Sequence, residues 1–331
     1  MRIVVTGATS FIGLAVIKEL LGLGHEVFAV VRPESPGRKK LESVWQEWLR
    51  RTGTEERLPE ETEAAGPVQL HLLSCRLESI RDLASAPLLH GGADAWLHLG
   101  WEGAGSANRQ NPQIQERNIG YALESLRTAA ALGCRRFLFS GSQAEYGIYR
   151  EVMREDGVCL PVSEYGKDKL KVCRMAAKEA ERLGVTYLHA RIFSVYGPGD
   201  HPWSLISTCI DTFLQGGHME LGDCTQMWNF LYITDTARAL AGLLLAKAPA
   251  GVYNVAGDDT RPLREYIKEL HGLCGGRGTY EYGKRPPNAE GVVSLMPDTG
   301  KLKEAAGFRQ EVSFEEGIRE MLNNRLKEKD T

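Results

Sequence analysis

The strongest constraint on the fold is a glycine-containing turn directly after the first β-branched run of the chain. Residues 2–5 predict a strand, and Thr6-Gly7-Ala8-Thr9-Ser10-Phe11-Ile12-Gly13 leads from it into an apolar-periodic helix at about 11–22. Gly7 permits a tight turn, and Gly13 permits close packing of the helix on the sheet. The free N–H groups at 10–12 would lie at the positive end of this helix, where a pyrophosphate binds. The pattern therefore predicts a dinucleotide site formed by Gly7, Thr9, Ser10, Phe11, Ile12 and Gly13.

The same alternation of short strands and amphipathic segments continues along most of the chain. Strands are predicted at 2–5, 26–31, 68–73, 95–99, 136–140 and 186–192, and helices at about 11–22, 115–132, 164–183 and 234–247. This alternation predicts an α/β fold with a Rossmann-type doubly wound parallel sheet. Residues 33–66 are too polar for a core, and we expect a surface excursion there with one helix at 39–51.

The regular pattern loosens after Pro198, where Gly216-Gly217, Gly222 and Pro286-Pro287 interrupt it. We therefore expect a dinucleotide-binding Rossmann domain at 1–195 and mainly a smaller C-terminal lobe at 196–331, which would bind the substrate. Residues 225–257 are expected to cross back to the first domain, because 234–246 has the pattern of another sheet-covering helix.

Composition and charge exclude several classes of function. The 331 residues carry a formal net charge of −3, which gives no basic excess for binding a nucleic acid. The seven cysteines form no C-x-x-C pair and no metal-ligand spacing, and they are typical of thiols in a reducing cytosol. No apolar run approaches the length of a membrane span, and the N-terminus lacks a signal-peptide pattern. We expect a cytoplasmic protein with no metal site and no membrane or nucleic-acid partner.

The residue after the second strand bears on the choice of cofactor. A carboxylate at this position would bind the adenosine ribose hydroxyls, whereas the guanidinium of Arg32 fits a 2′-phosphate. We therefore expect NADP as the cofactor, with NAD as the alternative. Leu99, at the end of the strand at 95–99, is a further expected cofactor contact.

Three side chains predict proton-transfer chemistry. Tyr165 and Lys169 are four residues apart at the start of a predicted helix, so they share one of its faces. A nearby ammonium favours the phenolate, which lets the tyrosine exchange a proton with a substrate oxygen. Ser142 follows the strand at 136–140, at the carboxyl edge of the sheet where such folds bind ligands. Ser142, Tyr165 and Lys169 are therefore the predicted catalytic residues.

These motifs resemble the extended short-chain dehydrogenase/reductase family over nearly the whole chain. The resemblance rests on the turn at 6–13, Asn118, the Ser-Tyr-Lys set and the runs at 191–199, 229–235 and 251–255. That family consists largely of NAD(P)-dependent epimerases, dehydratases and 4-keto-reductases of nucleotide-sugars. The resemblance implies that Ser142 orients the sugar oxygen, that Tyr165 is the acid/base and that Lys169 also holds the nicotinamide ribose.

The sequence departs from the family pattern at several positions. Ser10 replaces the middle glycine of the turn, and the segment at 74–77 lacks the acidic residue usual near the adenine. Gln143-Ala144 stands where the dehydratases have an Asp-Glu pair, so dehydration has no evident acid and base. Trp228 and Ser194 replace an arginine and an asparagine that usually serve the diphosphate. The expected substrate contacts are Ser142, Gln143, Ser194, His201, Trp203, Trp228 and Arg285, with Lys284 beside the last.

The favoured activity is NADPH-dependent reduction of a keto-sugar, with a nucleoside-diphosphate-4-keto-6-deoxyhexose as the expected substrate, because Arg32 favours NADPH. The alternative is an NAD-dependent nucleotide-sugar epimerase, which oxidises and re-reduces one carbon. A non-catalytic NADP-binding sensor is a third possibility, which the complete Ser-Tyr-Lys set disfavours. A homodimer is expected through the helices at about 115–132 and 164–183, because their apolar coverage is wider than one sheet-facing stripe requires.

Overall fold

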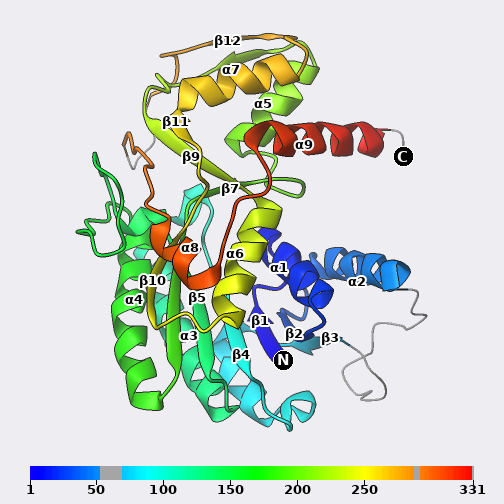
Figure 1. Cartoon of the computed structure of the whole chain (residues 1–331), viewed down its shortest axis with the longest axis vertical. Coiled ribbons are helices and arrows are strands. Elements are labelled where there is room, and N and C mark those ends of the chain that lie inside the picture. Colours follow the sequence, from blue (N-terminus) through cyan, green and yellow to red (C-terminus); the bar gives the residue numbers. More distant parts are fainter. Residues whose placement is uncertain (53–68, 287–290, 330–331) are drawn as a thin grey trace.

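The computed structural model describes residues 1–52, 69–286 and 291–329, and seven parallel strands of this part of the chain form a central sheet (Figure 1). The strand order is β10-β6-β5-β4-β1-β2-β3. The strands are β1 Arg2–Thr6, β2 Glu26–Val31, β3 Leu70–Ser74, β4 Ala95–His98, β5 Arg136–Ser142, β6 Thr186–Ile192 and β10 Gly251–Val255. The order reverses at β1, which pairs with β2 on one side and with β4 on the other. Doubly wound sheets bind ligands at such a reversal, outside the carboxyl ends of the strands.

Helices cover both faces of the sheet, because each strand directs alternate apolar side chains to opposite faces. Ile3 and Val5 belong to the core shared with α1, α2, α6 and α8, whereas Val4 belongs to the core shared with α3, α4 and the 3-10 helix η1. The bounds are α1 Phe11–Gly22, α2 Arg38–Thr52, η1 Leu77–Ser85, α3 Pro112–Ala131, α4 Glu164–Leu183, α6 Ile233–Leu245 and α8 Gly300–Ala306. Shorter 3-10 helices are η2 Pro87–Leu89, η3 Ser106–Asn108 and η4 Gln143–Glu145.

A smaller lobe lies at the top of Figure 1, beyond the central sheet. It contains β7 Ser194–Tyr196, α5 Leu205–Leu214, β8 His218–Glu220, β9 Met227–Tyr232, β11 Thr260–Pro262, α7 Leu263–Leu273, β12 Thr279–Glu281 and α9 Phe314–Lys329. Its core is aromatic, and Phe230 makes edge-to-face contacts with Tyr196 and Tyr266. Phe11 and Ile12 of α1 pack against this core, so the first turn of α1 joins the two parts of the molecule.

The chain passes between the two parts more than once. After β6 it enters the lobe, returns through α6 and β10 to the central sheet, and then re-enters the lobe at β11. This route explains why the apolar pattern loosens after Pro198, since short lobe elements alternate with elements that cover the central sheet.

The structure confirms the predicted fold class and the approximate positions of the predicted strands and helices. The helix expected at 39–51 is α2, which packs beside α1. Residues 53–66 of the expected surface excursion, and residue 68 of the strand expected at 68–73, lie outside the described residues. Among the helices that the structure describes, none combines the length and the apolar character that a membrane crossing needs.

Candidate active site

The turn after β1 has the backbone geometry of a phosphate-binding cradle. Gly7 has a φ of +69°, and a Cβ on this residue would lie 2.7 Å from the carbonyl carbon of Leu99. A Cβ on Gly13 would overlap the carbonyl oxygen of Gly7. Ser10 caps α1, and its hydroxyl accepts a hydrogen bond from the Gly13 N–H at 3.1 Å. The first N–H groups of α1 have no acceptor within the helix and carry its positive end.

The residues around this turn fit a bound nicotinamide dinucleotide. Thr9 meets the segment after β2, where its hydroxyl lies 3.1 Å from that of Ser35. Arg32 is exposed directly after β2, and Leu99 is half-buried directly after β4. The structure thus brings the ends of β1, β2 and β4 to one edge of the sheet. When bound there, the nicotinamide would accept or return a hydride at a substrate carbon.

Ser142 is the last residue of β5 and is buried. Its hydroxyl accepts a hydrogen bond from the Ala144 N–H at 3.2 Å, and its own N–H donates to Glu145 Oε1 at 2.8 Å. This reciprocal pattern is a capping box, which here holds the single turn η4. The hydroxyl is therefore held at the carboxyl edge of the sheet by local hydrogen bonds.

The first turn of α4 is packed tightly against η4. Ser163 caps α4 by accepting the Gly166 N–H, and the Tyr165 N–H donates to the carbonyl oxygen of Arg109 at 2.9 Å. A Cβ on Gly166 would overlap the carbonyl oxygen of Ala144. The missing side chain at Gly166 therefore lets α4, which carries Tyr165, approach the turn that begins at Ser142.

Lys169 is buried one helical turn after Tyr165. Its Nζ donates to the Ser140 carbonyl oxygen at 2.6 Å and lies 3.9 Å from the centre of the Trp101 ring. The same Nζ is 5.6 Å from the centre of the Tyr165 ring. Burial lowers the pKa of Lys169 to about 7, the Glu145 carboxylate opposes this shift, and Arg109 adds to it. The structure therefore brings Tyr165 and Lys169, near the start of α4, to the carboxyl end of β5, where Ser142 lies.

A cleft of about 560 Å³ separates this set from the smaller lobe. On the sheet side it is lined by Gln143 and Arg109, and the Arg109 guanidinium lies 4.3 Å from the centre of the Tyr165 ring. On the lobe side it is lined among others by Trp228 and Arg285. The predicted catalytic residues lie beside the cleft, next to Gln143 and Arg109, and do not themselves form its lining.

Only some of the predicted substrate contacts reach this cleft. Gln143, Trp228 and Arg285 line it, and the Trp228 Nε1 is buried with no hydrogen-bond partner among the described residues. Ser194 pairs with Phe230 in β7 and β9 and does not line the cleft. His201 and Trp203 stack on one another in the loop before α5, outside the cleft lining, and Trp203 is 70% exposed. Lys284 forms an ion pair with Glu281.

Three side chains beside this set were not predicted from the sequence. Trp101 and Arg109 follow β4. The Trp101 ring contacts the Tyr165 ring and the Lys169 Nζ, and the Arg109 guanidinium lies over the Tyr165 ring. The position of Trp101 after a central strand is a signal that could have indicated it, whereas Arg109 lies in a loop with no distinctive pattern. Glu145 is fully buried directly behind Ser142. Glu145 could have been noticed because it is an ionisable residue close to the end of a buried strand.

The Rossmann sheet, the cradle after β1 and the Ser-Tyr-Lys set at one sheet edge define an NAD(P)-dependent oxidoreductase of the extended short-chain type. A model of the NAD dependent epimerase/dehydratase family matches residues 3–256, and the chain belongs to this family. It is 24% identical over 345 residues to the ADP-L-glycero-D-manno-heptose-6-epimerase of Nitratidesulfovibrio vulgaris, across 98% of this chain and 97% of the relative.

Two solved structures share the fold over almost the whole chain. The UDP-glucose 4-epimerase of Thermotoga maritima, solved with UDP-glucose, gives a TM-score of 0.80 at 24% identity and covers 99% of both chains. MoeE5 in complex with UDP-glucuronic acid and NAD gives a TM-score of 0.76 at 25% identity, across 98% of this chain and all of the other.

These comparisons confirm the expected family and change the order of the expected activities. They include epimerases and give no specific support to a 4-keto-6-deoxyhexose reductase, which was the favoured expectation. They therefore support the alternative, a nucleotide-sugar epimerase, better. They also support NAD, which MoeE5 binds, and give no specific support to NADP.

Proposed function

We propose that this protein is an NAD(P)-dependent nucleotide-sugar epimerase that oxidises one sugar carbon and reduces it again on the opposite face. The observation that carries this proposal is that Ser142, Tyr165 and Lys169 lie together beside a cleft. The two residues directly after Ser142, Gln143 and Ala144, have no ionisable group. Such a site can move a hydroxyl proton and a hydride. It has no acid or base directly after Ser142 with which to eliminate water.

In the proposed reaction, Tyr165 takes the proton of the sugar hydroxyl while the carbon gives up its hydride, for which bound NAD(P) would be the acceptor, and a ketone forms. Ser142 donates a hydrogen bond to the same oxygen. Lys169, with its positive charge close to the Tyr165 ring, favours the phenolate that accepts the proton. Tyr165 returns a proton to the oxygen when the carbon is reduced again.

The cleft has features suited to the anionic half of a nucleotide-sugar. Arg109 and Arg285 are among the residues that line it, and guanidinium groups bind phosphate and carboxylate well. Trp228 offers an indole ring and a buried N–H that has no acceptor within the described residues. Arg285 and Trp228 are the proposed contacts of the diphosphate and its neighbouring ring, with Arg109 near the reacting sugar.

Proton NMR of the purified enzyme with UDP-glucose or UDP-glucuronate tests this proposal. The expected result is a mixture of two epimers, formed with a catalytic amount of cofactor and with no net change in nicotinamide absorbance. Stoichiometric oxidation of NADPH by a keto-sugar nucleotide would instead indicate the reductase. Cofactor binding without turnover of any sugar nucleotide would indicate a sensor.

Arg32 is the proposed selector of the adenosine phosphate. It is exposed after β2 and lies on the same sheet edge as the Thr9 and Ser35 hydroxyls. Arg32→Asp is expected to shift the ratio of NADP to NAD affinity toward NAD by at least about tenfold, because a carboxylate repels a 2′-phosphate and accepts from a ribose hydroxyl. Fluorescence titration with NADPH and NADH measures this ratio. An unchanged ratio would show that Arg32 contacts only solvent.

We also propose that the protein is a homodimer. Most of the apolar residues that suggested an interface are buried inside one chain, including Ala122, Leu126, Ala176 and Ala180. Large apolar side chains that remain exposed include Met175 of α4 and Val158, Leu160 and Val162 of the preceding loop. Light scattering is expected to give about twice 36.6 kDa. Leu160→Glu should shift the mass toward the monomer, and a monomeric mass for the unaltered protein would contradict the proposal.

A further inference from the structure

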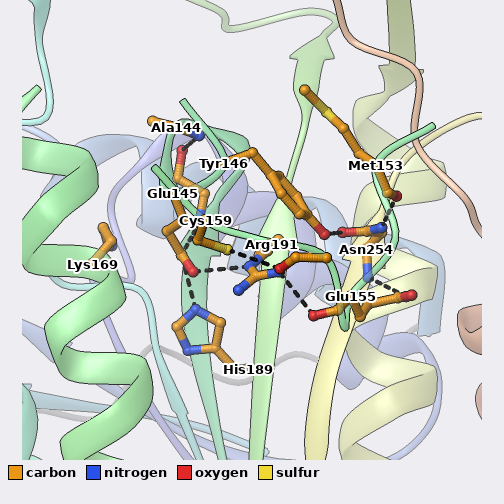
Figure 2. A network of polar contacts seen from close by, with 12 residues as sticks. Ala144, Glu145, Tyr146, Met153, Glu155, Cys159, Lys169, His189, Arg191 and Asn254 are labelled. Atoms are coloured by element: carbon orange, nitrogen blue, oxygen red, sulfur yellow. Dashed lines mark hydrogen bonds and ion pairs between the residues drawn. The ribbon is translucent and has the colours of Figure 1, made fainter. Parts of the chain in front are cut away.

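The carboxylate of Glu145, three residues after Ser142, is fully buried and contacts His189 and Arg191 (Figure 2). Glu145 Oε1 accepts the Ser142 N–H and lies 2.8 Å from His189 Nε2, and Glu145 Oε2 accepts Arg191 Nε at 2.9 Å. All three ionisable side chains are almost completely buried. Burying a carboxylate with two cationic partners costs free energy, because all of these charges are removed from water. The hydrogen bonds that compensate for this cost hold the neighbouring groups in one arrangement.

The local sequence is arranged to admit this carboxylate. In the parallel register of β5 and β6, Phe139 lies opposite His189 and Gly141 lies opposite Arg191, so the two cationic residues point to the same face of β6. A Cβ on Gly141 would overlap His189 Nε2 and would lie 2.7 Å from Glu145 Oε1. The glycine between Ser140 and Ser142 therefore provides the space in which Glu145 meets His189.

Lys169 stands next to this cluster on α4 (Figure 2). Its Nζ donates a hydrogen bond to the carbonyl oxygen of Ser140, two residues before Ser142 on the same strand. Glu145 and Lys169 therefore hold opposite ends of the short segment 140–142, which carries the catalytic hydroxyl. The two groups also attract one another electrostatically.

The charged and titratable groups around the two residues come from several elements. Glu145 is faced by His189 and Arg191 of β6, Lys169 and Cys173 of α4, and Cys159 of the preceding loop. Lys169 is faced by Glu145, His98, Arg109 and Tyr165. Arg191 also donates to the carbonyl oxygen of Glu155. Glu145 is the one carboxylate in this set whose charge stabilises the Lys169 ammonium, as far as the described residues show.

We propose that Glu145 is a positioning residue that fixes the backbone of Ser142 and keeps Lys169 in its charged form during catalysis. This inference rests on the proposed roles of Ser142 and Lys169. It assigns to the Glu145, His189 and Arg191 cluster a function beyond the packing of β5 against β6. Loss of the carboxylate would leave Lys169 beside Arg109, with no opposing charge among these groups.

The sign of the expected pH effect follows from the charges. Burial lowers the pKa of Lys169, and Glu145 counteracts this shift. Glu145 is itself charged, because burial would raise its pKa but His189 and Arg191 hold it at about 2. Glu145→Gln is therefore expected to lower the pKa of Lys169 further and to move the basic limb of the pH–rate profile to lower pH. A shift of about 1 to 3 pH units is typical for the loss of a close opposite charge.

The test combines that profile with a titration that needs no substrate. Lysine side-chain carbon NMR of the cofactor-free protein, assigned with Lys169→Arg, measures the Lys169 pKa directly. The expected result for Glu145→Gln is the same downward shift in the NMR titration and in the pH–rate profile. An unshifted Lys169 titration would overturn the proposal, whereas absence of epimerase turnover with a shifted titration would contradict only the proposed function.

A second variant tests the opposite direction and covers a failure of Glu145→Gln to fold. His189→Gln keeps a donor toward Glu145 and removes a positive charge, since burial opposes protonation of His189 but Glu145 outweighs it and raises its pKa to about 9. Lys169 is then expected to titrate at higher pH. An unchanged or lower pKa of Lys169 would show that the charges of this cluster do not act on Lys169, which would overturn the proposal.

A matched control is available in a buried carboxylate outside this cluster. Asp235 of α6 is fully buried, pairs with Arg238 and accepts the N–H groups of Glu311 and Val312. Asp235→Asn is expected to lower the midpoint of denaturant unfolding and to leave the Lys169 titration in place. An equal shift of Lys169 in this variant would show that any loss of a buried carboxylate has the effect, which would overturn the specific role of Glu145.

Discussion

Replacing Tyr165 by phenylalanine is expected to lower turnover by about two to four orders of magnitude, the usual contribution of a positioned acid or base. The ring would keep its edge-to-face contact with Trp101 and its contact with the Arg109 guanidinium. Only the hydroxyl that is proposed to exchange the proton would be lost. Single-turnover kinetics with a sugar nucleotide, together with cofactor titration, separate the loss of chemistry from any loss of binding.

Tyr253→Phe is the matched control for this variant. The Tyr253 hydroxyl donates to the carbonyl oxygen of Pro249 at 2.6 Å, away from the cleft. Its removal is expected to cost about 1 kcal/mol of unfolding free energy and to leave turnover unchanged. If Tyr165→Phe retained near-normal turnover, Tyr165 would not be the acid/base.

Gly166→Ala is expected to reduce turnover by about a hundredfold, which is the effect of moving a catalytic group by about 1 Å. The added methyl group would overlap the carbonyl oxygen of Ala144, so the first turn of α4 would have to move away from η4. That movement would carry Tyr165 away from Ser142. Steady-state kinetics and thermal unfolding of the variant measure the two consequences separately.

The control for this substitution is Gly120→Ala in the middle of α3. A Cβ on Gly120 would have no atom of another group within 4 Å. Alanine is favoured over glycine inside a helix by about 1 kcal/mol, so this variant is expected to be slightly more stable and fully active. Full activity of Gly166→Ala would mean that α4 and η4 can separate without affecting catalysis.

The central sheet could be predicted because its physical signals are local. Each strand is a short apolar run, each covering helix has an apolar stripe, and the turn at 6–13 needs glycine where the backbone passes close to other chain atoms. For the same reason, the set of Ser142, Tyr165 and Lys169 could be read from a strand end and a helical spacing. The parallel sheet then brings these separate segments to one edge.

The lobe and much of the cleft could not be predicted, because their contacts depend on chain segments far apart in sequence. Strands β8 and β12 pair with each other although residues 221–278 separate them in the sequence. Each is only three residues long, so neither has a periodic pattern of its own. His201 and Trp203 have the chemistry of a ligand site but stack on each other outside the cleft lining. Arg109 reaches Tyr165 only because the loop before α3 folds over the start of α4.

The return of the chain to the central sheet at β10 determines when that sheet can be completed during synthesis. Until residues 251–255 have left the ribosome, β6 is the outer strand on its side, and its backbone N–H and C=O groups have no neighbour there. The first half of the smaller lobe is translated before that neighbour arrives. The nascent protein therefore carries an open sheet edge at β6 while its smaller lobe begins to form.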